Sequence, residues 1–236
     1  MKPSQRVPLA EELAEIVQRS REMYAERVTA SPTAQPWWTA VIVTASSARQ
    51  AERYEFEIHR RRELGKIPAD VQYMVIPDWN DHRIGSGGAT IQALGALARK
   101  TLFRGQTEIV GLHLEGWWSR QRVLLIHSGG DSRRLPQYSL AGKLFTALPV
   151  RTPWGDVSTL FDEMLLLSTA WAAKLSSGLL VTSGDALLTF DSALLDWTKP
   201  GVCGVGMLQP AEVGTQHGVY IADDDGTSIR SSKKLR

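Results

Sequence analysis

At 236 residues the chain is long enough for one large domain, and its hydrophobic content of 43% supports a substantial core. The net charge of +2 is too small to indicate a nucleic-acid-binding surface, although it is compatible with small anionic ligands such as phosphates. The single cysteine, Cys203, excludes an internal disulfide, and no apolar run approaches the roughly 20 residues of a membrane helix. The sequence therefore predicts a soluble, cytoplasmic protein that binds neither nucleic acid nor membrane.

The N-terminal region predicts one amphipathic helix over residues 8–28, because its apolar positions recur at three- and four-residue steps. Pro32 and Pro36 follow it, and proline both lacks an amide donor and disfavours helix in the residue before it. We therefore expect residues 1–34 to form an appended helix with a linker, and residues 35–236 to form the main domain.

From residue 37 onward, short apolar segments alternate with amphipathic helical segments. Strands are expected over residues 40–45, 71–76, 122–126, 179–182 and 202–207, and helices over residues 48–64, 90–104 and 158–175. Such alternation is typical of an α/β fold with a mostly parallel sheet and helices on both faces. Residues 105–120 have no clear pattern, and the pairs Trp37-Trp38 and Trp117-Trp118 are expected in the core or in subunit contacts.

A glycine-rich, basic segment follows the strand expected at residues 122–126 and runs from Ser128 to Lys143, SGGDSRRLPQYSLAGK. Its paired glycines let backbone amides approach phosphate oxygens closely. Arg134 can hold a pyrophosphate with two parallel hydrogen bonds, and Lys143 can place a single charge on one phosphate. A tight turn beside solvated arginines has the same composition, so both interpretations stay open on this segment alone. A Walker-type loop is excluded, because Leu144 follows the lysine where serine or threonine is required.

Two further segments lie where strands or helices are expected to end or begin. Gly85, Ser86, Gly87 and Gly88 precede the helix expected at residue 90, and free amides at such a position either bind an anion or form a capping turn. Asp185 follows Gly184 directly after the strand expected at residues 179–182, where a carboxylate can bind a metal ion or simply form a Gly-Asp turn.

These residues resemble the sugar nucleotidyltransferases, which carry Gly-Gly-x-Gly-Thr-Arg-Leu-x-Pro followed by a Pro-Lys pair. Five positions match that pattern: Gly129, Gly130, Arg134, Leu135 and Lys143. The full segment, together with GSGGAT at residues 85–90, is most similar to the GDP-fucose pyrophosphorylase branch. Ser132 and Gly142 depart from the wider pattern, which has glycine and proline at those places.

The resemblance spans roughly residues 40–221 and implies a Rossmann-like, GT-A-like nucleotidyltransferase fold. It also implies transfer of GMP from GTP to fucose 1-phosphate, with Arg134 and Lys143 as catalytic residues and Mg²⁺ on Asp185. The residues that it implies for nucleotide binding are Gly85, Ser86, Gly87, Gly88, Ser128, Gly129, Gly130, Asp131, Ser132 and Arg133.

The family continues beyond the point that corresponds to Arg236, with a second metal-binding acid, a β-helical region and, in bifunctional members, a sugar kinase. We therefore expect a domain truncated at its C-terminus that binds Mg²⁺-GTP weakly and by itself releases little or no pyrophosphate. HGVYIADDDG at residues 217–226 resembles a hairpin leading to a lysine that contacts the sugar phosphate, either Lys233 or Lys234. Two alternatives remain: a non-catalytic nucleotide-binding relative, and a pyrophosphorylase for another sugar 1-phosphate or nucleotide.

Overall fold

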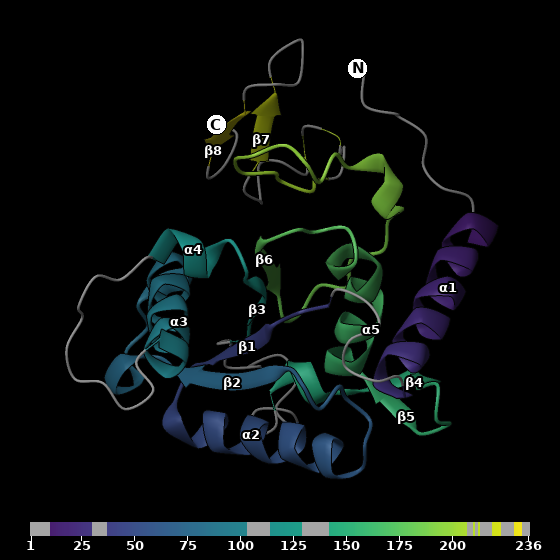
Figure 1. Cartoon of the computed structure of the whole chain (residues 1–236), viewed down its shortest axis with the longest axis horizontal. Helices are drawn as coiled ribbons and strands as arrows, with labels where there is room; N and C mark the ends of the chain where they lie inside the picture. Colours follow the sequence, from purple (N-terminus) through teal and green to yellow (C-terminus); the bar gives the residue numbers. More distant parts are fainter. Residues whose placement is uncertain are drawn as a thin grey trace. The chain divides into compact units, whose positions relative to one another are not determined.

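The computed structural model describes residues 10–29, 37–102, 114–128, 142–206, 210, 212, 219–222 and 229–232 (Figure 1). The chain divides into two compact units, Ala10–Thr198 and the residues outside that range, and each unit is described by itself. None of the helices in the described ranges is long and apolar enough to cross a membrane.

A four-stranded parallel sheet is the central layer of the unit Ala10–Thr198. Its strands are β1 (Ala40–Ala45), β2 (Gln72–Pro77), β3 (Arg122–His127) and β6 (Gly178–Ser183), in the order β2-β1-β3-β6. The strands expected at residues 40–45, 71–76, 122–126 and 179–182 are therefore confirmed to within about one residue at each end. All of β1 and the interior of β3 are buried, as is typical of parallel strands covered on both faces.

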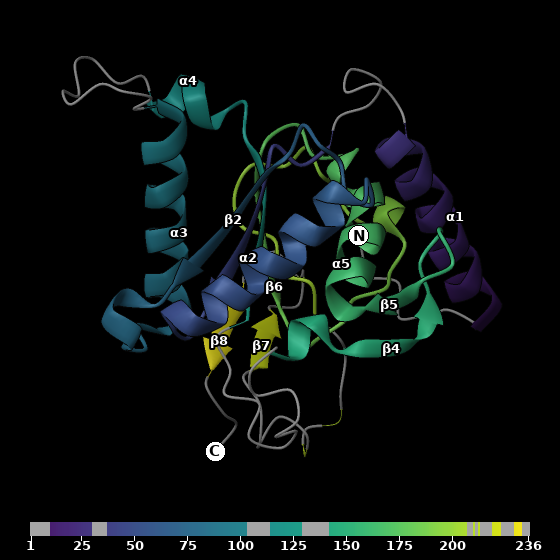
Figure 2. The same cartoon turned by 90° about the horizontal axis from the view of Figure 1, so that it is seen from below.

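Helices cover both faces of this sheet, as expected (Figures 1 and 2). Helices α2 (Ala48–Glu63) and α5 (Leu160–Ala172) pack on the face that carries Val41 and Leu124. Helix α3 (Gly85–Leu102) packs on the opposite face, which carries Ile42 and Leu125. Helix α1 (Ala10–Thr29) lies beside α5 in the same unit.

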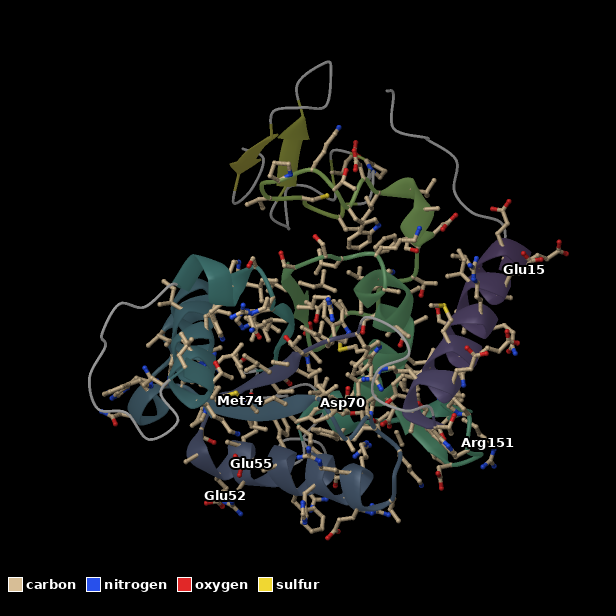
Figure 3. All side chains as sticks on the ribbon, in the orientation of Figure 1. Glu15, Glu52, Glu55, Asp70, Met74 and Arg151 are labelled. Carbon is tan, nitrogen blue, oxygen red and sulfur yellow. The ribbon has the colours of Figure 1, made fainter. Side chains whose placement is uncertain are left out.

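The outer sides of α1 and α2 carry charged residues, including Glu15, Glu52 and Glu55 (Figure 3). On the inner side of α2, Arg61 donates from Nε to Oδ1 of Asp162 on α5 at 2.7 Å. This ion pair joins α2 to α5 on the face of the sheet that both helices cover. The two helices are therefore held together by charge as well as by apolar packing.

The crossover through α5 has the opposite hand from the other two. The connections β1–α2–β2 and β2–α3–β3 move in opposite directions along the sheet and use opposite faces, so they have the same hand. The connection β3–α5–β6 runs in the same direction along the sheet as β2–α3–β3, but α5 lies on the face that α2 covers. This connection therefore has the opposite hand. Because about 98% of parallel crossovers are right-handed, this is an uncommon arrangement. On this connection, Leu144 and Phe145 pack on the face covered by α2.

The tryptophan pair before β1 lies in the core, as expected. Trp37 and Trp38 are almost fully buried, and their indole N–H groups donate to the hydroxyl groups of Thr169 and Ser168 on α5, at 3.3 and 3.0 Å. Trp117 of the short helix α4 (Leu114–Trp118) is also buried, against the α3 side of the sheet. The first pair therefore fixes α5 on one face, and α4 covers part of the other.

The structure differs from the expected elements in two places. An antiparallel hairpin of β4 (Ala147–Arg151) and β5 (Val157–Thr159) precedes α5 and was not expected. The strand expected at residues 202–207 is wrong, since residues 202–206 are exposed and have no regular secondary structure. Gly204 and Gly206 interrupt that apolar run, and glycine in the interior of a strand weakens it. None of the described strands pairs with this segment.

The unit outside Ala10–Thr198 contains one hairpin among its described residues. Strand β7 (Val219–Ala222) pairs antiparallel with β8 (Ile229–Ser232). This confirms the hairpin expected around residues 217–226, although the connecting residues 223–228 lie outside the described residues. Lys233 and Lys234 also lie outside them, so their role stays a prediction.

Candidate nucleotide site

The order of the strands creates a topological switch point between β1 and β3. The chain leaves β1 toward β2 on one side of the sheet order, whereas it leaves β3 toward β6 in the opposite direction. At the carboxyl ends of these two strands, Thr44 pairs in register with His127. Ligands of open α/β sheets bind in the crevice at such a switch point. The segments that follow β1 and β3 are therefore the first candidates for a nucleotide site.

A chain of hydrogen bonds joins β1, β3 and the start of α3 at this edge. Thr44 Oγ1 accepts the backbone N–H of Ser128 at 3.2 Å and lies 3.4 Å from Nδ1 of His127. Nε2 of the same histidine lies 3.0 Å from the hydroxyl of Thr90, which itself donates to the carbonyl of Ser86 at 2.8 Å. Since the Thr90 proton is already used, Nε2 of His127 donates to Thr90.

His127 therefore links the end of β3 to the Gly85–Thr90 segment. Partial burial lowers the pKa of His127, and the nearby carboxylate of Asp78 opposes this shift. The hydrogen bond to Thr90 and the lowered pKa both agree with a histidine that packs at the end of a strand. They give it a positioning role between two of the expected nucleotide-binding segments.

The structure brings together Lys143 and Asp185, which lie 42 residues apart in the sequence. Lys143 Nζ lies 3.5 Å from Oδ2 of Asp185. The Ser183 hydroxyl group donates to Oδ1 of Asp185 at 2.5 Å. The hydrogen bond from Ser183, aided by the charge of Lys143 and opposed by partial burial, lowers the pKa of Asp185. Both charged side chains are partly exposed, so they are accessible to a ligand.

Gly184 brings Asp185 close to the end of β3. Its backbone N–H donates to the carbonyl of His127 at 2.7 Å. A Cβ atom at this position would lie 2.9 Å from both that carbonyl oxygen and the Cβ atom of Ser128. Such distances are too short for any side chain, so glycine is required here. The Gly-Asp pair thus forms a turn that packs against the end of β3, with Gly184 buried and Asp185 exposed.

The donor set around Asp185 fits a magnesium ion that takes most of its ligands from a nucleotide. Within the described ranges, no group of three or more histidine, cysteine, aspartate or glutamate residues could hold a metal ion. Mg²⁺, however, is commonly bound by one or two carboxylates together with phosphate oxygens and water. Asp185 is ionised, partly exposed and oriented by Ser183, so it can supply one such ligand.

The glycines before Thr90 belong to α3 itself. This helix begins at Gly85 and not at residue 90, so Gly85, Ser86, Gly87 and Gly88 form its first turn. The low helix propensity of glycine predicted a loop here, but the first turn of a helix needs no hydrogen bonds from its own N–H groups. Gly85, Ser86 and Gly87 are exposed, and the N–H groups at the start of the helix that have no partner within it can bind an anion.

The remaining expected site residues fall in the sequence between Ser128 and Lys143. Ser128 at the start of this stretch of sequence is almost fully buried, and Lys143 lies at its other end. Gly129, Gly130, Asp131, Ser132, Arg133 and Arg134 lie outside the described residues, and their roles stay predictions.

Two residues near this edge were not found by the sequence analysis. Asp78 follows β2, and partial burial raises the pKa of its carboxyl group, against the effect of Arg83 and His127. Tyr54 on α2 contacts both Ser128 and Gly142, the described residues on either side of residues 129–141. Helical periodicity places Tyr54 on the inner face of α2 with Ala51 and Ile58, but it carries no signal of what the hydroxyl group binds.

Comparison with known proteins assigns a family to these features. The model of the fucose pyrophosphorylase domain matches residues 116–235. The chain is 33% identical over 202 residues to the bifunctional fucokinase/GDP-fucose pyrophosphorylase of Arabidopsis thaliana, covering 80% of this chain and 19% of that protein. It is 30% identical over 218 residues to the fucose-1-phosphate guanylyltransferase of Mus musculus, covering 91% of this chain and 34% of that protein. The human fucose-1-phosphate guanylyltransferase is 29% identical over 214 residues, which are 89% of this chain and 33% of that protein.

The chain thus spans about a third or less of the length of these curated relatives. No solved structure matches it significantly. The comparisons agree with the resemblance of the glycine-rich segments, and the fold agrees with the α/β class expected from that resemblance.

Proposed function

Because the chain belongs to the fucose pyrophosphorylase family, we propose that it serves the transfer of GMP from GTP to fucose 1-phosphate, which yields GDP-fucose and pyrophosphate. The observation that carries the proposal is the approach of Lys143 to Asp185 at the carboxyl edge of the sheet, beside the end of β3. The names of the relatives support GTP and fucose 1-phosphate as the substrates.

The reaction is a single displacement at phosphorus. A phosphate oxygen of fucose 1-phosphate attacks the α-phosphorus of GTP and forms a new P–O bond. The bond from the α-phosphorus to the oxygen that bridges to the β-phosphate breaks, and pyrophosphate leaves with the electron pair. Neither a covalent enzyme intermediate nor a protein base is required, so the protein contributes alignment and charge neutralisation.

Each residue of the site has a part in that chemistry. The ammonium group of Lys143 turns from Asp185 to the α-phosphate, where it stabilises the negative charge that accumulates during the attack. Asp185 would hold a magnesium ion, whose charge would offset the negative charge of the phosphates. The first turn of α3 at Gly85–Gly88 contacts the base or ribose, and the residues that follow Ser128 receive the triphosphate. Arg134 holds the departing pyrophosphate.

A panel of nucleotides tests this assignment. The melting temperature of the chain is measured with GTP, ATP and UTP, each with and without Mg²⁺, and pyrophosphate release is measured with GTP and fucose 1-phosphate. A ligand at about 100 times its Kd adds roughly 2.7 kcal/mol of stability, and we expect Mg²⁺-GTP to stabilise the chain most. Greater stabilisation by UTP or ATP would favour a different pyrophosphorylase, and stabilisation by none of the three would contradict nucleotide binding.

Replacing Lys143 with alanine is expected to weaken triphosphate binding without unfolding the chain. Its ion pair with Asp185 is partly exposed, and such pairs contribute only about 0–1 kcal/mol to stability. GTP affinity is measured by calorimetric titration and stability by thermal melting.

Lys66→Ala is the matched control, because Lys66 forms a similarly exposed ion pair with Asp156 near the β4–β5 hairpin. We expect Lys66→Ala to bind GTP like the parent chain. Equal affinity in both variants, or loss of a cooperative melt in Lys143→Ala, would show that Lys143 has a structural role instead.

Gly87→Val is expected to reduce GTP affinity while leaving the melting temperature nearly unchanged. A Cβ atom at Gly87 would meet no atom within 4 Å, so the folded chain accommodates the side chain. Close approach of the backbone to a nucleotide would be blocked. Gly95→Val in the middle of the same helix is the control, since its Cβ atom would meet only Arg99 at an ordinary 3.5 Å. Parent-like affinity in Gly87→Val would rule out contact between this turn and the nucleotide.

A further inference from the structure

Tyr54 is a fully buried residue of α2 whose hydroxyl group bonds to the end of β3. Its Oη lies 3.0 Å from Oγ of Ser128 and donates to the Ser128 carbonyl at 3.3 Å. Burial raises the pKa of Tyr54 to about 12, against the effect of the Ser128 hydrogen bond. The hydroxyl group therefore stays protonated at neutral pH and can always donate.

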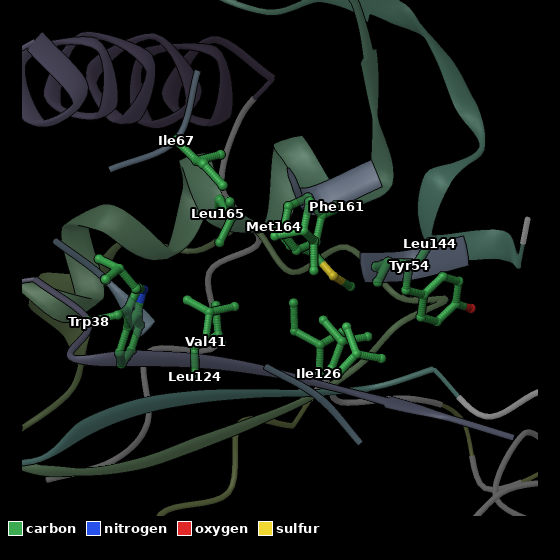
Figure 4. Close-up of a cluster of buried hydrophobic side chains, with 14 of the residues drawn as sticks. Trp38, Val41, Tyr54, Ile67, Leu124, Ile126, Leu144, Phe161, Met164 and Leu165 are labelled. Carbon is green, nitrogen blue, oxygen red and sulfur yellow. The ribbon is translucent and has the colours of Figure 1, made fainter. Parts of the chain in front are cut away.

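The same side chain contacts the segment that carries Lys143. A Cβ atom at Gly142 would lie only 1.9 Å from Oη of Tyr54, so the tyrosine packs directly on the backbone there. The short helix η3 (Lys143–Phe145) follows, and the ring of Phe145 lies 5.2 Å from that of Tyr54. Figure 4 shows Tyr54 beside Leu144 in the buried cluster. One residue thus contacts the chain on both sides of residues 129–141.

We propose that Tyr54 is a positioning residue that holds Ser128 and Lys143 in the arrangement that binds the nucleotide, an inference that rests on the proposed function. Tyr54 itself is buried and does not reach the substrate. It acts through its hydrogen bonds to Ser128 and through its packing on Gly142 and Phe145. Because α2 is joined to α5 by Arg61, the tyrosine is carried by a rigid support.

Filling the core at Tyr54 would require only the ring. Phenylalanine would fill the same space, and a buried hydroxyl group is unfavourable unless it forms hydrogen bonds. Here the hydroxyl group bonds only to Ser128 among the described residues, at the start of the expected phosphate loop. Tyr73 provides the contrast, since its hydroxyl group is also buried but has no hydrogen-bond partner in the described structure.

The test compares Tyr54→Phe with Tyr73→Phe, because each variant loses one buried tyrosine hydroxyl group. The Kd for Mg²⁺-GTP is measured by calorimetric titration well below the melting temperature, where both variants are folded. We expect GTP affinity to fall about tenfold in Tyr54→Phe, which corresponds to about 1.4 kcal/mol, and to stay at the parent value in Tyr73→Phe. A residue that only stabilises the fold would lower the melting temperature of Tyr54→Phe and leave this Kd unchanged.

A second comparison decides the matter even if Tyr54→Phe folds poorly. Ser128→Ala removes the same hydrogen bond from its other side, and we expect it to weaken GTP binding as well. Combining the two substitutions should add little, because both remove one interaction. Parent-like GTP affinity in Ser128→Ala, or effects of the two changes that simply multiply, would overturn the inference. If the parent chain bound no GTP at all, the proposed function would fail first.

Discussion

Replacing Asp185 with asparagine is expected to remove the magnesium dependence of GTP binding. Asparagine keeps the size of the side chain and can still accept from Ser183, but it loses the negative charge that attracts the ion. In the parent chain we expect GTP to bind on the order of tenfold more tightly with Mg²⁺ than with a chelator, a difference of about 1.4 kcal/mol. In Asp185→Asn the two affinities should be nearly equal.

The control for this variant is Asp156→Asn. Asp156 also forms an ion pair with a lysine, and the hydrogen bond from Lys66 lowers the pKa of Asp156. Asp156 lies between β4 and β5, outside the proposed nucleotide site. We expect Asp156→Asn to keep the full magnesium dependence. If Asp185→Asn kept it as well, the ion would have to bind to some other group, and Asp185 would be left as a partner of Lys143 alone.

Replacing Gly142 with alanine is expected to destabilise the folded chain by about 3 kcal/mol or more. Gly142 has a φ of 67°, which costs a residue with a side chain roughly 1 kcal/mol or more. The added Cβ atom would also lie 1.9 Å from Oη and 2.7 Å from Cζ of Tyr54, which is fully buried and cannot move aside without disturbing the core. Urea unfolding followed by tryptophan fluorescence measures the loss.

Gly65→Ala separates the two contributions. Gly65 has a similar φ of 62°, but a Cβ atom there would meet nothing within 4 Å. This variant should therefore show the cost of a positive φ alone, and the larger loss expected for Gly142→Ala reports the contact with Tyr54 together with the ψ of 161° at Gly142. Equal losses would mean that Tyr54 does not pack on Gly142. The positive φ also explains why this position departs from the wider family pattern, since the proline expected there is restricted to a φ near −65°.

The local sequence determined most of the individual elements in the described parts of the chain. The strands at residues 40–45 and 122–126 were predictable because runs of valine, isoleucine and leucine in a parallel sheet are buried on both faces. The helices α1, α2 and α5 were predictable from apolar residues at helical spacing. The glycine-rich segments similarly pointed to the family that the comparisons support. The cytoplasmic location and the base and sugar preferences stay predictions.

Only the tertiary structure decided how these elements combine. The segment at residues 202–206 has the composition of a strand, but a strand requires a neighbour for its backbone hydrogen bonds, and composition does not reveal whether one is present. Periodicity likewise placed Tyr54 on the inner face of α2 without revealing its bonds to Ser128. The approach of Lys143 to Asp185 depends on the crossover through α5, which returns the chain to β6 beside β3. Such contacts join residues far apart in sequence, and their geometry is set by the packing of whole helices and strands rather than by any local pattern.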